Sequence, residues 1–438
     1  MLRRTFLSVL ALGAVAPFMD ACGSESTTST TSPTTTAGTR RSSLRGSTPH
    51  ITGGADPKPA SLAINAFAQK LFDRLVALHP ANNLVFSPAS IAVALTMTSA
   101  GARGETQQQM LTVLQIADST AIHQSMNGLT NTLAALNQLV DNTTQGGTGS
   151  SQVELSIANS LWGQAGLAFE QAFLDLLSAD YDAGLELVDY KSDPEAARVA
   201  INDWVKKQTK DRIPQLLAKG TITENSRLTL VNAIYLKANW ATKFSKDLTV
   251  DGSFAAPAGK VTVSMMHRTD RLAYATGEGW QAVDLPYAFG GLSLLVAVGD
   301  APDVVLPTGD EVFGALENRL VELTFPKFDI ETATDLSSVL SVMGMPTAFT
   351  DNADFSGMTA SEKLVISSVI HQANITVDEE GTEAAAATAV VMEATSAPAP
   401  EEPVVLTVDR PFTYWLRDTV TNTIVFMGRV NDPSAKRG

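Results

Sequence analysis

The sequence is poor in cysteine and histidine, which limits the chemistry that it can support. Cys22 is the only cysteine among the 438 residues, so no disulfide can form within the chain. There is no Gly-x-Ser-x-Gly elbow, no His-Glu-x-x-His helix and no phosphate-binding glycine loop, so we do not expect an enzyme. The histidines are scattered without the spacing of metal ligands, so we predict no metal and no cofactor: His50, His79, His123, His267 and His371.

Basic side chains are also few. Lys and Arg together number 31 against 46 Asp and Glu, which gives a formal net charge of −15. A protein that binds nucleic acid needs clustered Lys and Arg to hold phosphates, and the sequence has no such cluster, so nucleic acid is excluded as a partner. With 44% hydrophobic and 18% charged residues, the chain can bury a large core. We therefore expect a globular protein.

No charge interrupts the apolar run over residues 6–18, which follows the pair Arg3-Arg4. This pattern is typical of a signal peptide, and the run is too short to span a membrane. Met19-Asp20-Ala21-Cys22 resembles a lipobox, in which the cysteine is lipidated after cleavage. We predict a lipoprotein-like signal over residues 1–21 and an exported protein, extracellular or in the cell envelope, that meets a membrane only through lipid on Cys22. The alternative is an ordinary signal peptide with an incidental cysteine.

Residues 22–58 contain almost no large apolar side chains and are dominated by Ser, Thr, Gly and Pro. Such a segment cannot bury enough surface to offset the entropy of ordering. We predict a disordered tether over residues 22–58, followed by one folded domain over residues 59–438.

Helical periodicity dominates the first part of this domain. From Ser61 onward apolar residues recur at three- and four-residue steps, and Ser87-Pro88 and Asp193-Pro194 are typical helix starts. Beyond Arg227 short runs rich in Val, Leu and Thr predict strands over residues 228–236, 260–263, 291–298, 321–325 and 364–369. Helices first and strands later, without regular alternation, predict an α+β fold with large mixed or antiparallel sheets.

The segment from Val377 to Pro403 has two interpretations. Its alanines have the propensity for a helix. Alternatively, the segment is a mobile loop that can become a strand, because small uncharged residues alternate from Thr382 to Thr388 while Glu383 falls on the opposite face. After Val391 the segment becomes polar and then rich in proline, which prevents a regular central strand. A loop of this length inside a compact domain is usually functional or disordered.

The run Glu379-Glu380-Gly381-Thr382-Glu383, followed by Ala384 to Thr388, resembles the hinge of the serpin reactive-centre loop. Further segments resemble serpin segments in the family's order, from about residue 60 to 433: Asn83-Leu-Val-Phe-Ser87-Pro88-Ala-Ser90-Ile91, Gly101-Ala-Arg-Gly104-Glu-Thr106, Leu230 to Trp240, Pro326-Lys-Phe328, Asp354 to Met358, Arg410-Pro411-Phe412 and Phe426 to Pro433. One chance motif could not produce this series.

The resemblance implies a monomeric suicide inhibitor of serine proteases. A target protease cleaves the reactive-centre loop, at about residues 381–403, stays attached as an acyl-enzyme, and is trapped when the hinge inserts into the large sheet. The residues that match the family's hinge are Glu379, Gly381, Thr382, Ala384, Ala386 and Thr388. The alternative is a non-inhibitory serpin that acts as a binding or chaperone-like protein.

Other positions match the family's polar "shutter" beneath the opening strands and its "breach" where the loop enters. Ser87, Ser90, Asn232 and His371 match the shutter, and Trp240 matches the breach. Each also has a purely structural interpretation: Ser87 would cap a helix, and Trp240 would fill core volume.

Counting from Gly381, as in inhibitory members, places the reactive bond at Thr395-Ser396. Cleavage after Met392, Ala394 or Ala397 is an alternative. A small residue before the bond suits elastase-like or subtilisin-like proteases, and the loop lacks the Arg or Lys that trypsin-like proteases require. Cysteine proteases also form an acyl intermediate, so the sequence leaves the class of the target open.

Overall fold

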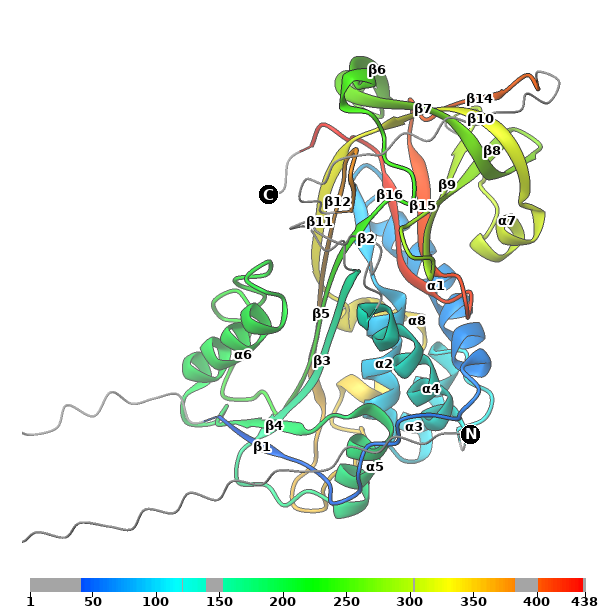
Figure 1. Ribbon diagram of the computed structural model, residues 1–438. Coiled ribbons are helices and arrows are strands. Elements are labelled where there is room, and N and C mark those ends of the chain that lie inside the picture. The colour runs from blue at the N-terminus through cyan, green and yellow to red at the C-terminus, as the bar shows by residue number, and fades with distance from the viewer. Residues whose placement is uncertain (1–40, 120, 139–152, 302–303, 383–400, 436–438) are drawn as a thin grey trace, which may run out of the picture. The chain divides into compact units, whose positions relative to one another are not determined.

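A computed structural model describes residues 41–119, 121–138, 153–301, 304–382 and 401–435 (Figure 1). It confirms the predicted α+β fold with large mixed or antiparallel sheets, of which the described residues form two, both mixed. The predicted signal peptide, Cys22 and most of the predicted loop lie outside the described residues.

Sheet A has seven strands, with β5 and β12 near its centre. β5 is almost continuously buried because helices cover both faces of the sheet, which explains why most of its residues are apolar. In spatial order, the strands are β1 (Ser42–Leu44), β4 (Leu185–Val188), β3 (Glu154–Gln164), β5 (Leu228–Asn239), β13 (Gly381–Thr382), β12 (Ile366–Val377) and β11 (Phe328–Asp335).

Sheet B has nine strands and carries the C-terminal part of the chain. Eight of its strands follow one path, and β6 (Val250–Ala256) pairs with β7 beside that path. In spatial order, the path is β14 (Val404–Thr407), β10 (Glu317–Pro326), β7 (Gly259–Gly277), β8 (Trp280–Pro286), β9 (Leu292–Gly299), β15 (Phe412–Asp418), β16 (Ile424–Val430) and β2 (Leu84–Phe86).

Helices pack on opposite faces of sheet A, with α6 on one face and α2 and α4 on the other (Figure 1). The α-helices are α1 (Lys58–Leu78), α2 (Pro88–Ser99), α3 (Gly104–Val113), α4 (Ile122–Ala135), α5 (Gln171–Tyr181), α6 (Pro194–Gln208), α7 (Gly309–Ala315) and α8 (Ser337–Met343). Short 3-10 turns are η1 (Leu136–Gln138), η2 (Lys246–Leu248) and η3 (Pro346–Phe349). None of these described helices is long and apolar enough to cross a membrane.

Helix α2 is buried along its whole length beneath sheet A. Its start is the one that the sequence predicts, because the Ser87 side chain caps it by accepting from Ser90 N, and Pro88 has no backbone N–H that would need an acceptor. The hydroxyls of Thr96 and Thr98 donate to backbone carbonyls one turn earlier, so these polar groups are satisfied inside the core. The cap therefore also fixes Ser87 and Ser90 below the sheet.

Two predictions about the first half of the chain need correction. The predicted tether extends too far, because residues 41–57 belong to the folded body: β1 pairs with β4, and Ile51 N donates to Ala179 O at 2.9 Å. Polar and backbone contacts hold this segment in place. Its composition, which has few apolar residues, therefore did not indicate that it is ordered. The first half also contains strands β3 and β4, which the helical periodicity did not predict.

Candidate functional site

Gly381 and Thr382 form β13, a short strand that lies between β5 and β12 at one end of sheet A. Gly381 pairs with Asn239, and Thr382 pairs with both Ala238 and Val377. Beyond this point β5 and β12 pair directly, in parallel, from Ala373 opposite Ile234 onward. The first residues of the predicted hinge thus occupy the place where the two central strands separate.

The backbone of β13 requires glycine at position 381. Gly381 has a φ of +151°, and a Cβ there would lie 2.1 Å from Ala238 O. No side chain fits at that distance, because real Cβ atoms do not approach a backbone oxygen so closely. The glycine lets the chain enter the sheet directly beside β5.

Thr382 is 1% exposed, and its hydroxyl lies 2.6 Å from the hydroxyl of Tyr287. Burial raises the pKa of Tyr287 well above its ordinary value, so the phenol stays protonated. The Tyr287 ring stacks on Trp240 with 4.5 Å between the ring centroids. The sequence did not predict Tyr287, which comes from the segment after β8.

Trp240 fixes the turn that precedes β13. Its indole Nε1 donates to Asp378 O at 2.9 Å, and its backbone N donates to Glu380 O at 2.9 Å. The ring also packs edge-on against Phe244. Trp240 therefore bonds to the turn before the predicted hinge residues of β13, in addition to filling core volume.

Two acidic residues anchor the same turn to sheet B and its neighbours. Glu379 is 4% exposed and accepts from Lys327 Nζ at 2.7 Å and from Thr249 Oγ1 at 2.9 Å. Burial alone would raise the pKa of the Glu379 carboxyl, but these hydrogen bonds outweigh it and hold the pKa below its ordinary value. The carboxylate is therefore ionised at neutral pH.

Glu380 makes a second set of ion pairs, to Lys243 at 2.5 Å and to Lys246 at 3.0 Å. Here too, burial would raise the pKa of the carboxyl, and the two lysines outweigh burial and lower it. The lysines that pair with Glu379 and Glu380 lie far away in sequence, so no local pattern indicated them. Together these contacts hold the near end of the loop in place.

A polar network runs beneath the strands that β13 begins to separate. Ser87 N donates to His371 Nε2 at 3.1 Å, and Ser90 N donates to Ser87 Oγ at 3.2 Å. Ser90 Oγ donates to Asn159 Oδ1 at 2.6 Å, and that oxygen also accepts from Asn232 Nδ2 at 3.1 Å. The structure thus joins all four predicted shutter residues in one network, in which Asn159, which the sequence did not reveal, links Asn232 to Ser90.

His371 and Asn232 lie directly opposite each other on β12 and β5. Burial lowers the pKa of His371 to about 3, so its ring is neutral at physiological pH. Because Nε2 accepts from Ser87, the ring proton is assigned to Nδ1. Within the described residues His371 Nδ1 and Asn232 Oδ1 have no hydrogen-bond partner. The network can therefore form further hydrogen bonds at the junction between β5 and β12.

The far end of the loop returns to a different sheet. The described chain ends within sheet A at Thr382 and resumes at Glu401, which pairs with Arg271 of β7. β14 then pairs in parallel with β10 in sheet B. The other predicted loop residues, Ala384, Ala386, Thr388 and the bond Thr395-Ser396, lie outside the described residues.

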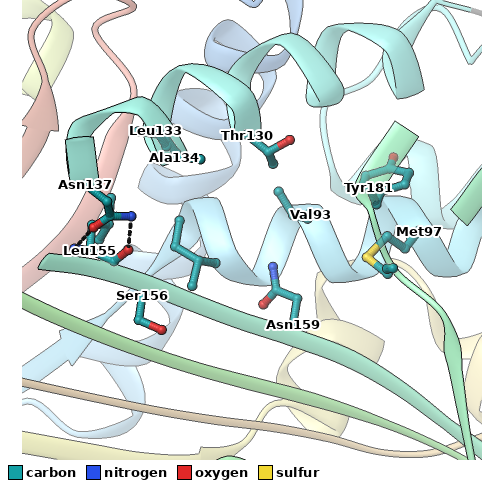
Figure 2. A pocket seen from close by; sticks show the side chains of 12 residues that line it. Val93, Met97, Thr130, Leu133, Ala134, Asn137, Leu155, Ser156, Asn159 and Tyr181 are labelled. Atoms are coloured by element: carbon teal, nitrogen blue, oxygen red, sulfur yellow. Dashed lines mark hydrogen bonds between the residues drawn. The ribbon is translucent and has the colours of Figure 1, made fainter. Parts of the chain in front are cut away.

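A cavity of about 340 Å³ lies under β3, between that strand and helices α2 and α4 (Figure 2). Figure 2 shows Asn159 rising from β3 toward α2, so this residue belongs both to the cavity wall and to the shutter network. Val93 and Met97 of α2 and Leu133 of α4 form much of the apolar lining.

Nothing in the described residues forms a metal centre, since no group of three or more His, Cys, Asp and Glu side chains could hold an ion there. The main features are instead the short strand β13 between β5 and β12, a turn before it that ion pairs hold in place, and a polar network beneath β5 and β12.

Comparison with known proteins explains this arrangement. Residues 62–433 match the family described as serpin (serine protease inhibitor). An uncharacterized serpin-like protein of Thermococcus kodakarensis is 35% identical over 383 residues, covering 86% of this chain and 86% of that protein. The leukocyte elastase inhibitor of Bos taurus is 34% identical over 396 residues, covering 85% of this chain and 99% of the inhibitor.

Solved structures agree with the sequence comparisons. The structure of thyroxine-binding globulin in complex with thyroxine has a TM-score of 0.73 and 28% identity, and the match covers 86% of this chain and 100% of the globulin. The family therefore includes both protease inhibitors and a protein that binds a small molecule. The match to the family spans nearly the whole folded body, and on this basis the chain belongs to the serpin family.

Proposed function

We propose that this protein is a suicide inhibitor of serine proteases, which traps its target by inserting the cleaved loop between β5 and β12. The observation that carries the proposal is β13, because Gly381 and Thr382 lie between β5 and β12, where an inserted strand would begin. The loop that follows has the side chains needed to continue in the same register.

The register of β13 predicts where each later loop residue would lie. Thr382 is opposite Ala238 and Val377, and both pairings are antiparallel, so each step along the loop moves one residue back along β5 and β12. Thr388 would then lie between Asn232 and His371, which also face each other in the present ladder. Its hydroxyl could pair with the atoms that now lack partners, Asn232 Oδ1 and His371 Nδ1.

The intervening alanines fit the two faces of the sheet. Ala384 and Ala386 would share the core-facing side with Thr382 and Thr388, since side chains alternate along a strand. Ala387 would lie opposite Ala233, which packs against the residues of α6. Small side chains fit in both places, whereas larger ones would have to displace the core or the helix.

Glu383 is the charged exception, and its position in the register is favourable. It would lie opposite Lys237 of β5, on the same face as Ala387 but nearer the end of the sheet. Lys237 is only half-buried in the structure, so an ion pair there remains in contact with water. Opposite charges in such a cross-strand pair stabilise the sheet modestly.

The chemistry belongs to the target protease. Its serine attacks the carbonyl carbon before the scissile bond, the peptide C–N bond breaks, and the amine leaves on the C-terminal fragment, which leaves an acyl ester. Insertion then draws the attached protease across sheet A before water can hydrolyse the ester. Ionic anchoring of Glu379 and Glu380 would hold the near end of the strand in register while this happens.

We further propose an elastase-like or subtilisin-like target. Thr395 is small, and Arg and Lys are absent between Thr382 and Pro403. The similarity to leukocyte elastase inhibitors supports this class. The proposal is tested by incubating the full chain with elastase-like, subtilisin-like, chymotrypsin-like and papain-like proteases, followed by denaturing gels and mass spectrometry.

We expect a band at the summed mass that survives denaturation, and a released C-terminal peptide that begins at Ser396. A peptide that begins after Met392, Ala394 or Ala397 would keep the mechanism and correct the bond. Loop cleavage by the whole panel with full retention of protease activity would contradict inhibition. That result would favour a non-inhibitory binding protein, the function class that the thyroxine-binding relative represents.

We also propose that the protein is exported and anchored by lipid on Cys22. In bacterial cells that express the full chain, Cys22→Ser should move the protein from the membrane pellet to the soluble fraction and abolish incorporation of labelled fatty acid. The neighbouring change Ser24→Ala should leave both properties as in wild type. An unchanged membrane fraction for Cys22→Ser would contradict the anchor.

A further inference from the structure

The segment before α1 lies along the edge of sheet A and then crosses to the helices beneath it (Figure 1). We call residues 41–57 the strap. Its first part, β1, pairs antiparallel with β4 from Ser42 opposite Leu187 onward. Arg41 adds an ion pair to Glu186 of β4 at 2.7 Å. The strap thus begins as the outermost strand of sheet A.

The strap next contacts α5. Gly46 N donates to Ser178 Oγ at 2.8 Å, and the Asp175 carboxylate accepts from Ser47 N at 2.6 Å and from Thr48 N at 3.2 Å. The approach at Gly46 is very close, since a Cβ there would lie 2.4 Å from the Asp175 Cα. A side chain at position 46 would therefore push this part of the strap off α5.

The last part of the strap contacts α4. Asn127 Nδ2 and Asn131 Nδ2 both donate to Ile51 O, at 2.9 and 3.1 Å. Gly128 lets the strap pass closely, because a Cβ there would lie 2.3 Å from Ala55 O. Ser125 Oγ then donates to Asp56 O at 2.7 Å, just before α1 begins. The strap is therefore attached at three successive elements.

These attachments join parts of the molecule that loop insertion must separate. A new strand between β5 and β12 divides sheet A, and β1, β4, β3 and β5 form the half that must move away from β12. Helix α1, at the other end of the strap, packs on α4 and on β16 of sheet B. Movement of the β4 edge therefore either strains the strap or detaches it.

We propose that the strap is a tie that holds sheet A closed and slows the spontaneous insertion of the uncleaved loop. The proposal rests on the loop insertion proposed above. Each hydrogen bond that the strap keeps in the closed sheet and loses in the open one raises the barrier to opening. Residues 41–57 are then part of the conformational control of the inhibitor, in addition to linking it to the N-terminal segment.

Matched glycine variants of the full chain test the strap. Gly46→Val should displace it, whereas Gly53→Val should not, because nothing lies within 4 Å of a Cβ at position 53. Uncleaved samples are incubated below their unfolding temperature, and the fraction that acquires resistance to heat and urea is followed over time. Gly46→Val should convert at least about tenfold faster than wild type, since a lost hydrogen bond is worth a factor of roughly two to ten. Gly53→Val should match wild type.

A gain of stability with time distinguishes this role from simple damage, which would only lower stability. Hydrogen exchange over residues 42–51 reports whether the strap has detached, and Asp175→Ala provides a second way to detach it. Conversion at the wild-type rate in a variant with a detached strap would overturn the proposal. If even loop-cleaved wild type gains no resistance, the proposed loop insertion itself is contradicted.

Discussion

Replacement of Thr382 by arginine is expected to convert the protein from an inhibitor into a substrate. Thr382 is already buried in β13 between Ala238 and Val377, so an arginine there would leave the sheet in the uncleaved protein, and its guanidinium would have to be buried among apolar neighbours when the loop inserts. An uncompensated buried charge costs about 3–5 kcal/mol, enough to slow insertion by more than about a hundredfold. The acyl-enzyme would then be hydrolysed faster than the loop inserts, and the protease would be released in active form.

The measurement is the partition between covalent complex and cleaved inhibitor at a fixed ratio of protease to protein. Thr382→Arg should give cleaved chain and active protease, with cleavage at the same bond as in wild type. The matched control is Thr382→Val, which keeps the shape, loses the hydrogen bond to Tyr287, and should still trap most of the protease. As much covalent complex from Thr382→Arg as from wild type would contradict insertion through β13.

The sequence predicts local structure well where one physical signal dominates. The run from Leu228 predicts a strand over residues 228–236, and β5 extends over Leu228–Asn239, because a strand buried on both faces is rich in apolar residues on both sides. Ser87-Pro88 predicts the start of α2 through its cap. By contrast, β3 carries Ser156, Asn159 and Ser160 among its apolar residues, so it gave no clear strand signal.

The site illustrates the same limit at longer range. The small residues after Gly381 indicate a segment that can enter a sheet, but its position depends on Ala238 and Val377, which lie far away in the chain. Likewise, Glu379 is recognisable in the hinge sequence, whereas its partner Lys327 becomes evident only when sheet B is placed beside the turn. Pairings of this kind depend on topology, and periodicity carries no information about them.

The strap shows why composition alone misleads. Residues 41–57 resemble the Ser- and Thr-rich segment before them, yet they are held by backbone pairing with β4 and by side chains of α4 and α5. These partners bond to the backbone N–H and C=O groups of the strap. Backbone groups are present whatever the side chains, so composition does not report on them. A polar segment can therefore be ordered without an apolar face, provided that other elements present matching groups.

Mild acid is expected to destabilise the native state through His371. Burial lowers the pKa of His371 from 6.5 to about 3, so between these values the unfolded chain binds a proton that the folded chain does not. The free energy of unfolding therefore falls as the pH drops below 6.5, by up to about 1.4 kcal/mol per pH unit. Above pH 6.5 the ring is neutral in both states and has no such effect.

His371→Gln isolates this contribution, because glutamine keeps an acceptor for Ser87 N but does not titrate near neutral pH. Urea unfolding from pH 7.5 down to about 5 should give a shallower loss of stability for His371→Gln than for wild type. Burial also lowers the pKa of His123, to about 4, so both proteins should keep a residual pH dependence. The carboxylates of Glu379 and Glu380 act only at lower pH, because their pKa values lie below the ordinary 4.5. Identical slopes for the two proteins above pH 5 would show that His371 is not the group responsible.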